Sequence, residues 1–315
     1  MLKSISDIPV LFIAFARPQF ARKVFDVIKQ AEPKKLYFYC DKARHGDFEE
    51  LERNNIIRDY IKEISWDCDL KTWFRDENIG VDPSMENAID WLFKNEEIGI
   101  ILEEDCVPSL AFFDFCRQLL PKYNDDKRVW FISGNNFIEG YNPNGYDYII
   151  SSASYQWGWA GWRDRWLKMN RGAFDLSAMI DYRLNRQFYA NQKLAYYSDR
   201  QMKRWQDKHG YWDPKPWDSR FQLTMRCNGG LAIVPKDNLV SNIGVYGSHA
   251  KKENKLVHNK KIFGTDVYEI NRHPPFVVAD FRYATMFYKK IIKPRMSLFR
   301  RITNKTLNMF FKKSL

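Results

Sequence analysis

The sequence contains few cysteines, and no two of them have CxxC spacing. The five cysteines are Cys40, Cys68, Cys106, Cys116 and Cys227. Because their number is odd and their spacing is irregular, we expect neither a disulfide framework nor a zinc site. This pattern is typical of a protein in a reducing compartment.

Long apolar runs are also absent. No stretch approaches the ~20 apolar residues that a helix needs to cross a bilayer. The N-terminal apolar stretch ends at Arg17, and no small-residue cleavage site follows it. We therefore expect a first strand there rather than a signal peptide.

Acidic residues are missing from one end of the chain. Residues 281–315 contain ten Lys or Arg and no Asp or Glu, and since the total charge is +11, residues 1–280 carry only +1. The cations alternate with apolar residues, a pattern typical of segments that bind anionic membranes, where each Lys or Arg contributes on the order of 1 kcal/mol. We predict a catalytic domain over 1–280 and a basic amphipathic tail over 281–315. The tail would hold a cytoplasmic protein on the inner face of the membrane. The alternative is a helix that packs on the body with its charges in water.

Apolar runs and helical periodicity alternate through the first 135 residues. The apolar runs predict strands at 9–16, 34–41, 61–67, 98–105 and 128–134, and the periodic segments predict helices at 19–31, 48–61, 82–95 and 110–123. This alternation is typical of a doubly wound α/β sheet. After Gly134 the alternation ends. An aromatic, glycine-rich stretch follows, then a charged helical region, a strand at 231–240 and a Gly/Ser/His loop at 241–250. We expect residues 1–135 to bind a nucleotide and residues 136–280 to bind an acceptor.

Three consecutive carboxylates follow a buried strand. Glu103, Glu104 and Asp105 come directly after the apolar run 100–102. In open α/β sheets the carboxyl ends of the strands form the ligand site, and Asp41 and Arg17 also lie at such ends. Hard oxygen ligands suit Mn²⁺ or Mg²⁺ carried with a diphosphate. The alternative is that the glutamates are solvated and Asp105 faces the following helix N-terminus.

The sequence also resembles a known family. The stretch ILEEDCVPSLAFFDFC resembles the acidic motif of inverting GT-A-fold glycosyltransferases related to N-acetylglucosaminyltransferase I. The similarity extends from residue 9 to residue 250 in the same order, through VLFIAFARPQFARKVFD, YCD, DDKRVWFISGNNF, SYQWGWAGWRDRW, PWDSRF and GVYGSHA. The triplet is Glu-Glu-Asp here, where the family usually has Glu-Asp-Asp. The resemblance implies a GT-A-like, Rossmann-type mixed sheet flanked by helices, as in the bacterial proteins of this group that build surface polysaccharides.

The resemblance also implies roles for individual residues. Asp218 would be the catalytic base, and Asp105 would be the direct metal ligand. Donor binding would involve Arg17 at the phosphates, Asp41 at the uracil ring, Glu103 and Glu104 on the ribose and sugar side, Trp217 beside the base, and Ser248 and His249 in a loop that closes over the diphosphate. The implied activity is transfer of a sugar, with inversion, from a UDP-sugar to a carbohydrate or lipid-linked acceptor.

Several alternatives remain open on the sequence alone. Asp218 could be a helix N-cap. Trp157, Trp159 and Trp162 could form either a sugar-stacking platform or a packed aromatic plug. A nucleotidyltransferase is disfavoured, because no glycine-rich loop follows the first strand. A nucleic-acid binder is disfavoured by the near-neutral body and the lack of recognition motifs.

Overall fold

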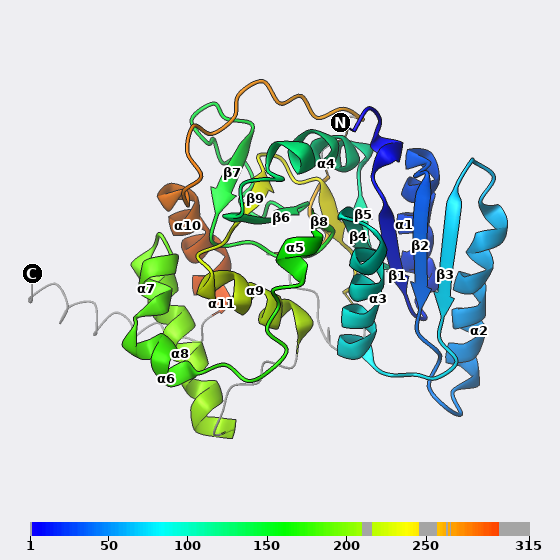
Figure 1. Cartoon of the computed structure of the whole chain (residues 1–315), viewed down its shortest axis with the longest axis horizontal. Helices are drawn as coiled ribbons and strands as arrows, with labels where there is room; N and C mark the ends of the chain where they lie inside the picture. The colour runs from blue at the N-terminus through cyan, green and yellow to red at the C-terminus, as the bar shows by residue number, and fades with distance from the viewer. Residues whose placement is uncertain (1, 210–215, 246–256, 263, 265, 296–315) are drawn as a thin grey trace, which may run out of the picture.

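The computed structural model describes residues 2–209, 216–245, 257–262, 264 and 266–295. Its centre is an eight-stranded sheet in the order β3-β2-β1-β4-β8-β6-β9-β7. The strands are β1 (Val10–Ala14), β2 (Lys35–Cys40), β3 (Asp69–Phe74), β4 (Ile98–Glu103), β6 (Val129–Ser133), β7 (Tyr148–Ser151), β8 (Trp159–Trp162) and β9 (Leu231–Pro235). A second, two-stranded sheet pairs β5 (Cys106–Pro108) with β10 (Val240–Asn242). The single large sheet runs through both halves of the chain (Figure 1).

Strand direction changes once the first four strands are in place. β3, β2, β1 and β4 are parallel, whereas β8 is antiparallel to both of its neighbours, β4 and β6. β9 is parallel to β6, and β7 closes the sheet antiparallel to β9. The predicted α/β fold with a mixed sheet flanked by helices is therefore confirmed.

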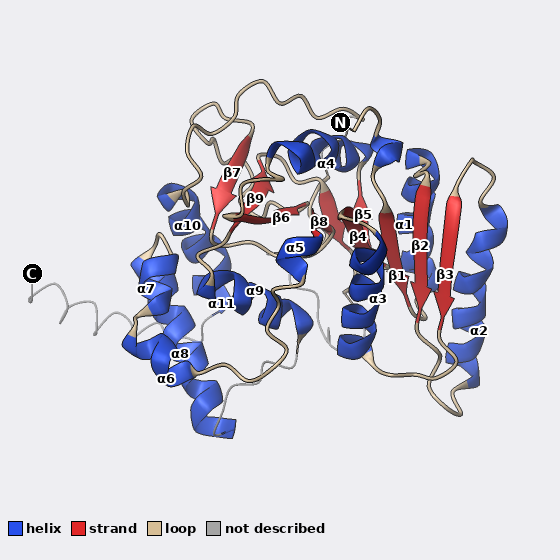
Figure 2. Ribbon diagram, viewed as in Figure 1, coloured by secondary structure: helices blue, strands red, loops and turns tan. Residues whose placement is uncertain are grey.

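Helices cover both faces of the sheet (Figure 2). One face carries α1 (Pro18–Ala31), α2 (Phe48–Arg58) and α4 (Leu110–Lys122), and the other carries α3 (Val81–Asn95), α5 (Arg163–Trp166) and α9 (Trp217–Cys227). The remaining α-helices are α6 (Leu176–Asp181), α7 (Leu184–Phe188), α8 (Gln192–His209), α10 (Phe281–Phe287) and α11 (Lys293–Arg295). Short 3₁₀ turns lie at Ile5–Asp7 and Asp59–Glu63, and a π-helical turn at Tyr288–Ile292 joins α10 to α11.

Apolar spacing explains why these segments fold as they do. All five residues of β1 are buried, as expected for a strand covered on both faces. α1 begins with Pro18 at its first position and buries Ala21, Val24, Phe25 and Ile28 on one side, at helical spacing. The buried strands and the apolar sides of the helices that cover them together form the core.

Two predicted strands differ in the structure. Residues 61–67 form the end of the 3₁₀ turn and a loop, and the strand is β3 at Asp69–Phe74. Ile64 and Trp66 pack on the core from this loop, and the Trp66 indole N–H donates to the Pro33 carbonyl at 3.0 Å. β3 lies at the sheet edge and is only partly buried, so it lacks the apolar run that marks a central strand. The predicted strand 231–240 is divided into β9 and β10, which belong to different sheets.

The aromatic stretch after Gly134 is mainly core. Trp159 and Trp162 are each 1% exposed, so neither forms an accessible sugar platform. Trp159 packs against Trp166 and Trp217, with ring centroids 6.2 and 6.3 Å apart, and against Phe221 at 5.6 Å. This cluster joins β8 and α5 to α9 and so fixes the position of the first turn of α9.

All five cysteines are free thiols. Among the described residues, no helix is both long and apolar enough to cross a membrane.

Candidate functional site

Two of the three carboxylates at the end of β4 are paired with a cation from the turn that follows β1. Arg17 donates from Nε to Glu104 Oε1 at 2.6 Å and from Nη2 to Asp105 Oδ2 at 2.9 Å. β1 and β4 are parallel neighbours with Ile13 opposite Glu103, which places the residues after both strands at one edge of the sheet. Arg17 is therefore the positive partner of two of the three acids.

Glu104 also organises the turn that leaves β1. Its Oε2 accepts a hydrogen bond from the Phe15 backbone N–H at 2.8 Å and a longer one from Arg17 N–H at 3.4 Å. The side chain is thus directed at the β1–α1 turn and at Arg17, which fixes the position of the guanidinium.

Glu103 has a different environment. No hydrogen bond or ion pair to its carboxylate is found among the described residues. Burial, followed by the negative charges of Asp105 and Asp218, raises the pKa of Glu103 well above its usual range. A carboxylate with a raised pKa is stabilised when it binds a proton or a cation.

α9 brings Asp218 to the same edge. Asp218 is the second residue of the helix, and Pro216 occupies the N-cap without a side-chain hydrogen bond, so Asp218 is not the N-cap residue. Its Oδ1 accepts from the Ser219 backbone N–H at 2.6 Å. Burial raises the pKa of Asp218 despite the hydrogen bonds from Ser219, and the charge of Asp82 raises it further.

Two contacts of Trp217 hold the start of α9. The Trp217 ring is nearly parallel to that of Trp159, at an interplanar angle of 24°. The Trp217 backbone N–H donates to Asp82 Oδ1, in the first turn of α3, at 3.2 Å. Asp82 was not singled out from the sequence, where the dipeptide Asp-Pro indicated only a helix start.

The segment after β10 covers Asp105. Ile243 N–H donates to the Asp105 carbonyl at 2.8 Å, and Gly244 N–H donates to Asn242 Oδ1 at 2.9 Å. A Cβ atom on Gly244 would lie 2.0 Å from Asp105 Oδ2 and 3.2 Å from Arg17 Nη1. Only glycine fits this approach without displacing the ion pair. Ser248 and His249, in the predicted closing loop, lie outside the described residues.

Asp41 lies at the end of β2 and is 4% exposed. Its carboxylate accepts from Asn78 Nδ2 at 3.2 Å and from the Lys42 backbone N–H at 3.0 Å. Asn54, fully buried in α2, donates to the carbonyls of Phe15 and Asp41 and so ties the ends of β1 and β2 together. Asn54 was missed because a single Asn within a helical pattern gives no signal of function.

The carboxylate oxygens of Glu103, Glu104 and Asp105 are the type of ligand that a divalent cation prefers. Among the residues that the structure describes, no three His, Cys, Asp or Glu side chains are grouped to hold a metal ion. Asp105 is ion-paired with Arg17, and Glu103 has no donor within the described chain. Hard carboxylate oxygens of this kind fit Mn²⁺ or Mg²⁺, which commonly takes one or two protein carboxylates and completes its coordination with phosphate.

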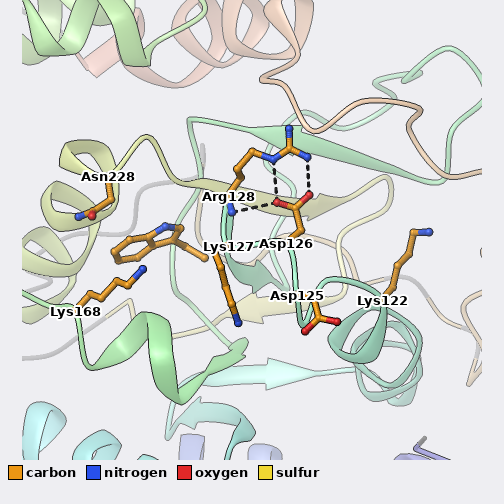
Figure 3. Close-up of a pocket in the computed structure, with 8 residues that line it drawn as sticks. Lys122, Asp125, Asp126, Lys127, Arg128, Lys168 and Asn228 are labelled. Carbon is orange, nitrogen blue, oxygen red and sulfur yellow. Dashed lines mark hydrogen bonds and ion pairs between the residues drawn. The ribbon is translucent and has the colours of Figure 1, made fainter.

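A separate pocket of about 790 Å³ lies at the other end of the strands, where β6 begins. Figure 3 shows Lys168 and Asn228 on one side of it, Lys122 and Asp125 on the other, and Arg128 paired with Asp126. Because β6 runs in the direction of β4, this pocket is remote from the carboxylates at the end of β4.

Comparisons with known proteins find only distant likenesses in overall arrangement. No protein-family model matches it, and no curated protein matches it. A mannosyltransferase from Pyrobaculum calidifontis, solved with GDP-Man and Mn²⁺, shares 15% identity at a TM-score of 0.42, with 78% of this chain and 61% of that chain covered. This chain therefore spans less than two thirds of that enzyme.

Two further solved structures show a similar level of likeness. A UDP-glucose pyrophosphorylase in complex with UDP-glucose shares 6% identity at a TM-score of 0.35, with 75% of this chain and 93% of that chain covered. A 4-diphosphocytidyl-2C-methyl-D-erythritol synthase from Anaerococcus prevotii shares 10% identity at a TM-score of 0.30, with 54% and 78% covered. We assign no residue of this chain from these similarities.

Glu103→Gln should stabilise the protein at neutral pH. The raised pKa means that the folded state binds the proton more tightly than the unfolded state, so stability falls as pH rises above the unfolded-state value. Removing the charge should raise Tm by about 2 °C at neutral pH and leave it unchanged at acidic pH, where both states are protonated. Thermal melts across pH, with exposed Glu52→Gln as control, test this. An equal Tm for wild type and Glu103→Gln at neutral pH would contradict it.

Gly244→Ala should destabilise the site. The new methyl group must displace either Asp105 or the backbone of the segment, and overpacking of this kind typically costs about 1–3 kcal/mol. Gly264→Ala is the matched control, because nothing lies within 4 Å of a Cβ built there. Equal unfolding midpoints in denaturant for the two variants would show that the contact at Gly244 is not close.

Proposed function

We propose that the chain is an inverting glycosyltransferase that moves a sugar from a UDP-sugar to a carbohydrate or lipid-linked acceptor. The observation that supports this best is the position of Asp218. This half-buried carboxylate, on a helix far along the chain, lies close enough to Glu103 for its charge to raise the pKa of that residue. Asp218, from the second half of the chain, thus lies near Glu103, at the end of β4 in the first half. The resemblance to glycosyltransferases related to N-acetylglucosaminyltransferase I assigns the same two elements to base and donor.

The proposed chemistry requires one base. Asp218 takes the proton of an acceptor hydroxyl while that oxygen bonds to the anomeric carbon and the bond from that carbon to the diphosphate oxygen breaks. The raised pKa makes Asp218 a stronger base than a solvated aspartate. The packing of Trp217 against Trp159 and its bond to Asp82 would keep the carboxylate aimed.

Asp105 would hold Mn²⁺ or Mg²⁺, and Glu103 and Glu104 would line the ribose and sugar side of the donor. When bound, the ion would offset the negative charge of the departing diphosphate. Arg17 would then exchange Asp105 for the donor phosphates while its bond to Glu104 keeps it in place. Asp41 would meet the uracil ring. Ser248 and His249 would close over the diphosphate on the segment that follows Gly244.

Cellular placement is also part of the proposal. Residues 281–315 would bind the inner face of the membrane, where acceptors for surface polysaccharides are carried on lipids. The domain division at residue 280 belongs to the same proposal.

Asp218→Asn should lower turnover by roughly 10²–10⁴, the usual contribution of a general base, and should leave donor binding unchanged. UDP release from a panel of UDP-sugars, with exposed Asp181→Asn as control, measures turnover. Normal turnover per folded molecule would sink the assignment. Formation of UTP from UDP-sugar and pyrophosphate would instead identify a nucleotidyltransferase.

Asp105→Asn should bind the donor weakly and lose its dependence on divalent cations. Isothermal titration of UDP into wild type, with and without EDTA, supplies the comparison. We expect EDTA to weaken UDP binding to wild type by about tenfold or more and to have no effect on the variant. UDP binding that neither EDTA nor the substitution changes would exclude the metal.

A further inference from the structure

A segment without helix or strand lies against β7, at one edge of the large sheet. Residues 271–280, here called the strap, lie beside β7, which is the last strand in the sheet order. Asp147 N–H donates to the Arg272 carbonyl at 3.1 Å, and Asp280 N–H donates to the Ile150 carbonyl at 2.9 Å. Asp147 Oδ2 accepts from the backbone N–H groups of Asn271 and Arg272, each at 2.8 Å. The strap is therefore fixed to the body at both ends, and Figure 1 shows it leading into α10.

The strap presents apolar side chains outward. Val277 and Ala279 pack against the core, whereas Phe276 is 71% and Val278 is 62% exposed. Phe281, at the start of α10, is 60% exposed. Three large apolar side chains are thus exposed within six residues of sequence. Grouped exposed apolar side chains, unlike single ones, generally mark an interaction site.

The chain on either side of these residues is rich in exposed cations. Arg272, Arg282, Lys289 and Lys290 are exposed on the strap and on the helices that follow it. Asp280 is the only acid between residues 271 and 295. Its carboxylate is already engaged, since it accepts from Tyr141 Oη at 2.5 Å and caps α10 through the N–H groups of Arg282 and Tyr283.

We propose that the outward face of the strap, with Phe276, Val278 and Phe281 at its centre, binds an anionic lipid surface. Apolar side chains enter the boundary between headgroups and acyl chains while the surrounding cations meet lipid phosphates. The backbone is held at Arg272 and Asp280, so little conformational entropy is lost on binding. A protein partner is less suited, because the four exposed cations complement a uniformly negative layer.

This inference extends the membrane part of the proposed function, but it places the contact on the folded body rather than on the tail alone. It does not depend on sugar transfer. Membrane partition and donor binding can be measured separately on the same preparation, so failure of one does not imply failure of the other.

The test is sedimentation of the full chain with phosphatidylcholine vesicles, with and without phosphatidylglycerol, at low salt. We expect wild type to sediment with the anionic vesicles only. The combined variant Phe276→Ser, Val278→Ser, Phe281→Ser should partition about tenfold less, since it loses most of the apolar area offered to the lipid. Phe48→Ser is the matched control, because Phe48 is 81% exposed but lies at the start of α2.

Three results would overturn the proposal. Equal sedimentation of wild type and the triple variant would show that the strap face does not contact lipid. Equal loss in the Phe48→Ser control would show that any exposed phenylalanine has the same effect. A concentration-dependent dimer of wild type that the triple variant abolishes, without any change in vesicle binding, would assign the face to a second copy of the chain.

Discussion

The structure around the candidate site depends on the double ion pair between Arg17 and the carboxylates Glu104 and Asp105. Adjacent carboxylates at the end of a buried strand repel each other and lose hydration, and one guanidinium offsets both effects because its fork can contact two acids at once. The same arrangement holds the turn after β1 through Phe15 and sets how closely Gly244 can approach. Any cation or phosphate that enters this edge must therefore rearrange these contacts.

A second group of acids lies at the same edge. Glu103, Asp218 and Asp82 come from β4, α9 and α3. Burial is the main cause of the raised pKa of both Glu103 and Asp218, and the charges of Asp105 and Asp218 raise the pKa of Glu103 further, as that of Asp82 does for Asp218. This arrangement costs stability in the absence of a ligand, as functional sites commonly do. Packing around Trp159, Trp166 and Trp217 maintains it, since those rings hold α9 against α3 and the sheet.

The sheet separates three surfaces. The carboxylates lie at the carboxyl ends of β1, β2 and β4. The pocket lined by Lys122, Arg128 and Lys168 lies at the other end of the strands, where β6 begins. The strap lies along the outermost strand, β7. Donor chemistry and lipid contact would thus use different parts of one rigid framework, so each can be altered by substitution without direct contact with the other.

The sequence by itself determined the first half of the fold, because buried parallel strands read as continuous apolar runs and the helices between them have clear periodicity. It also located the acidic strand end and the cation that follows β1. It did not locate β3, whose half-exposed edge position carries no apolar run, and it did not show that β8 separates β4 from β6. Only the tertiary structure decided that Arg17 pairs with two of the acids, that Asp82 contacts the start of α9, and that the strap exposes Phe276 and Val278. Each of these depends on contacts between residues far apart in the chain, and the local periodicity of the sequence does not predict such contacts.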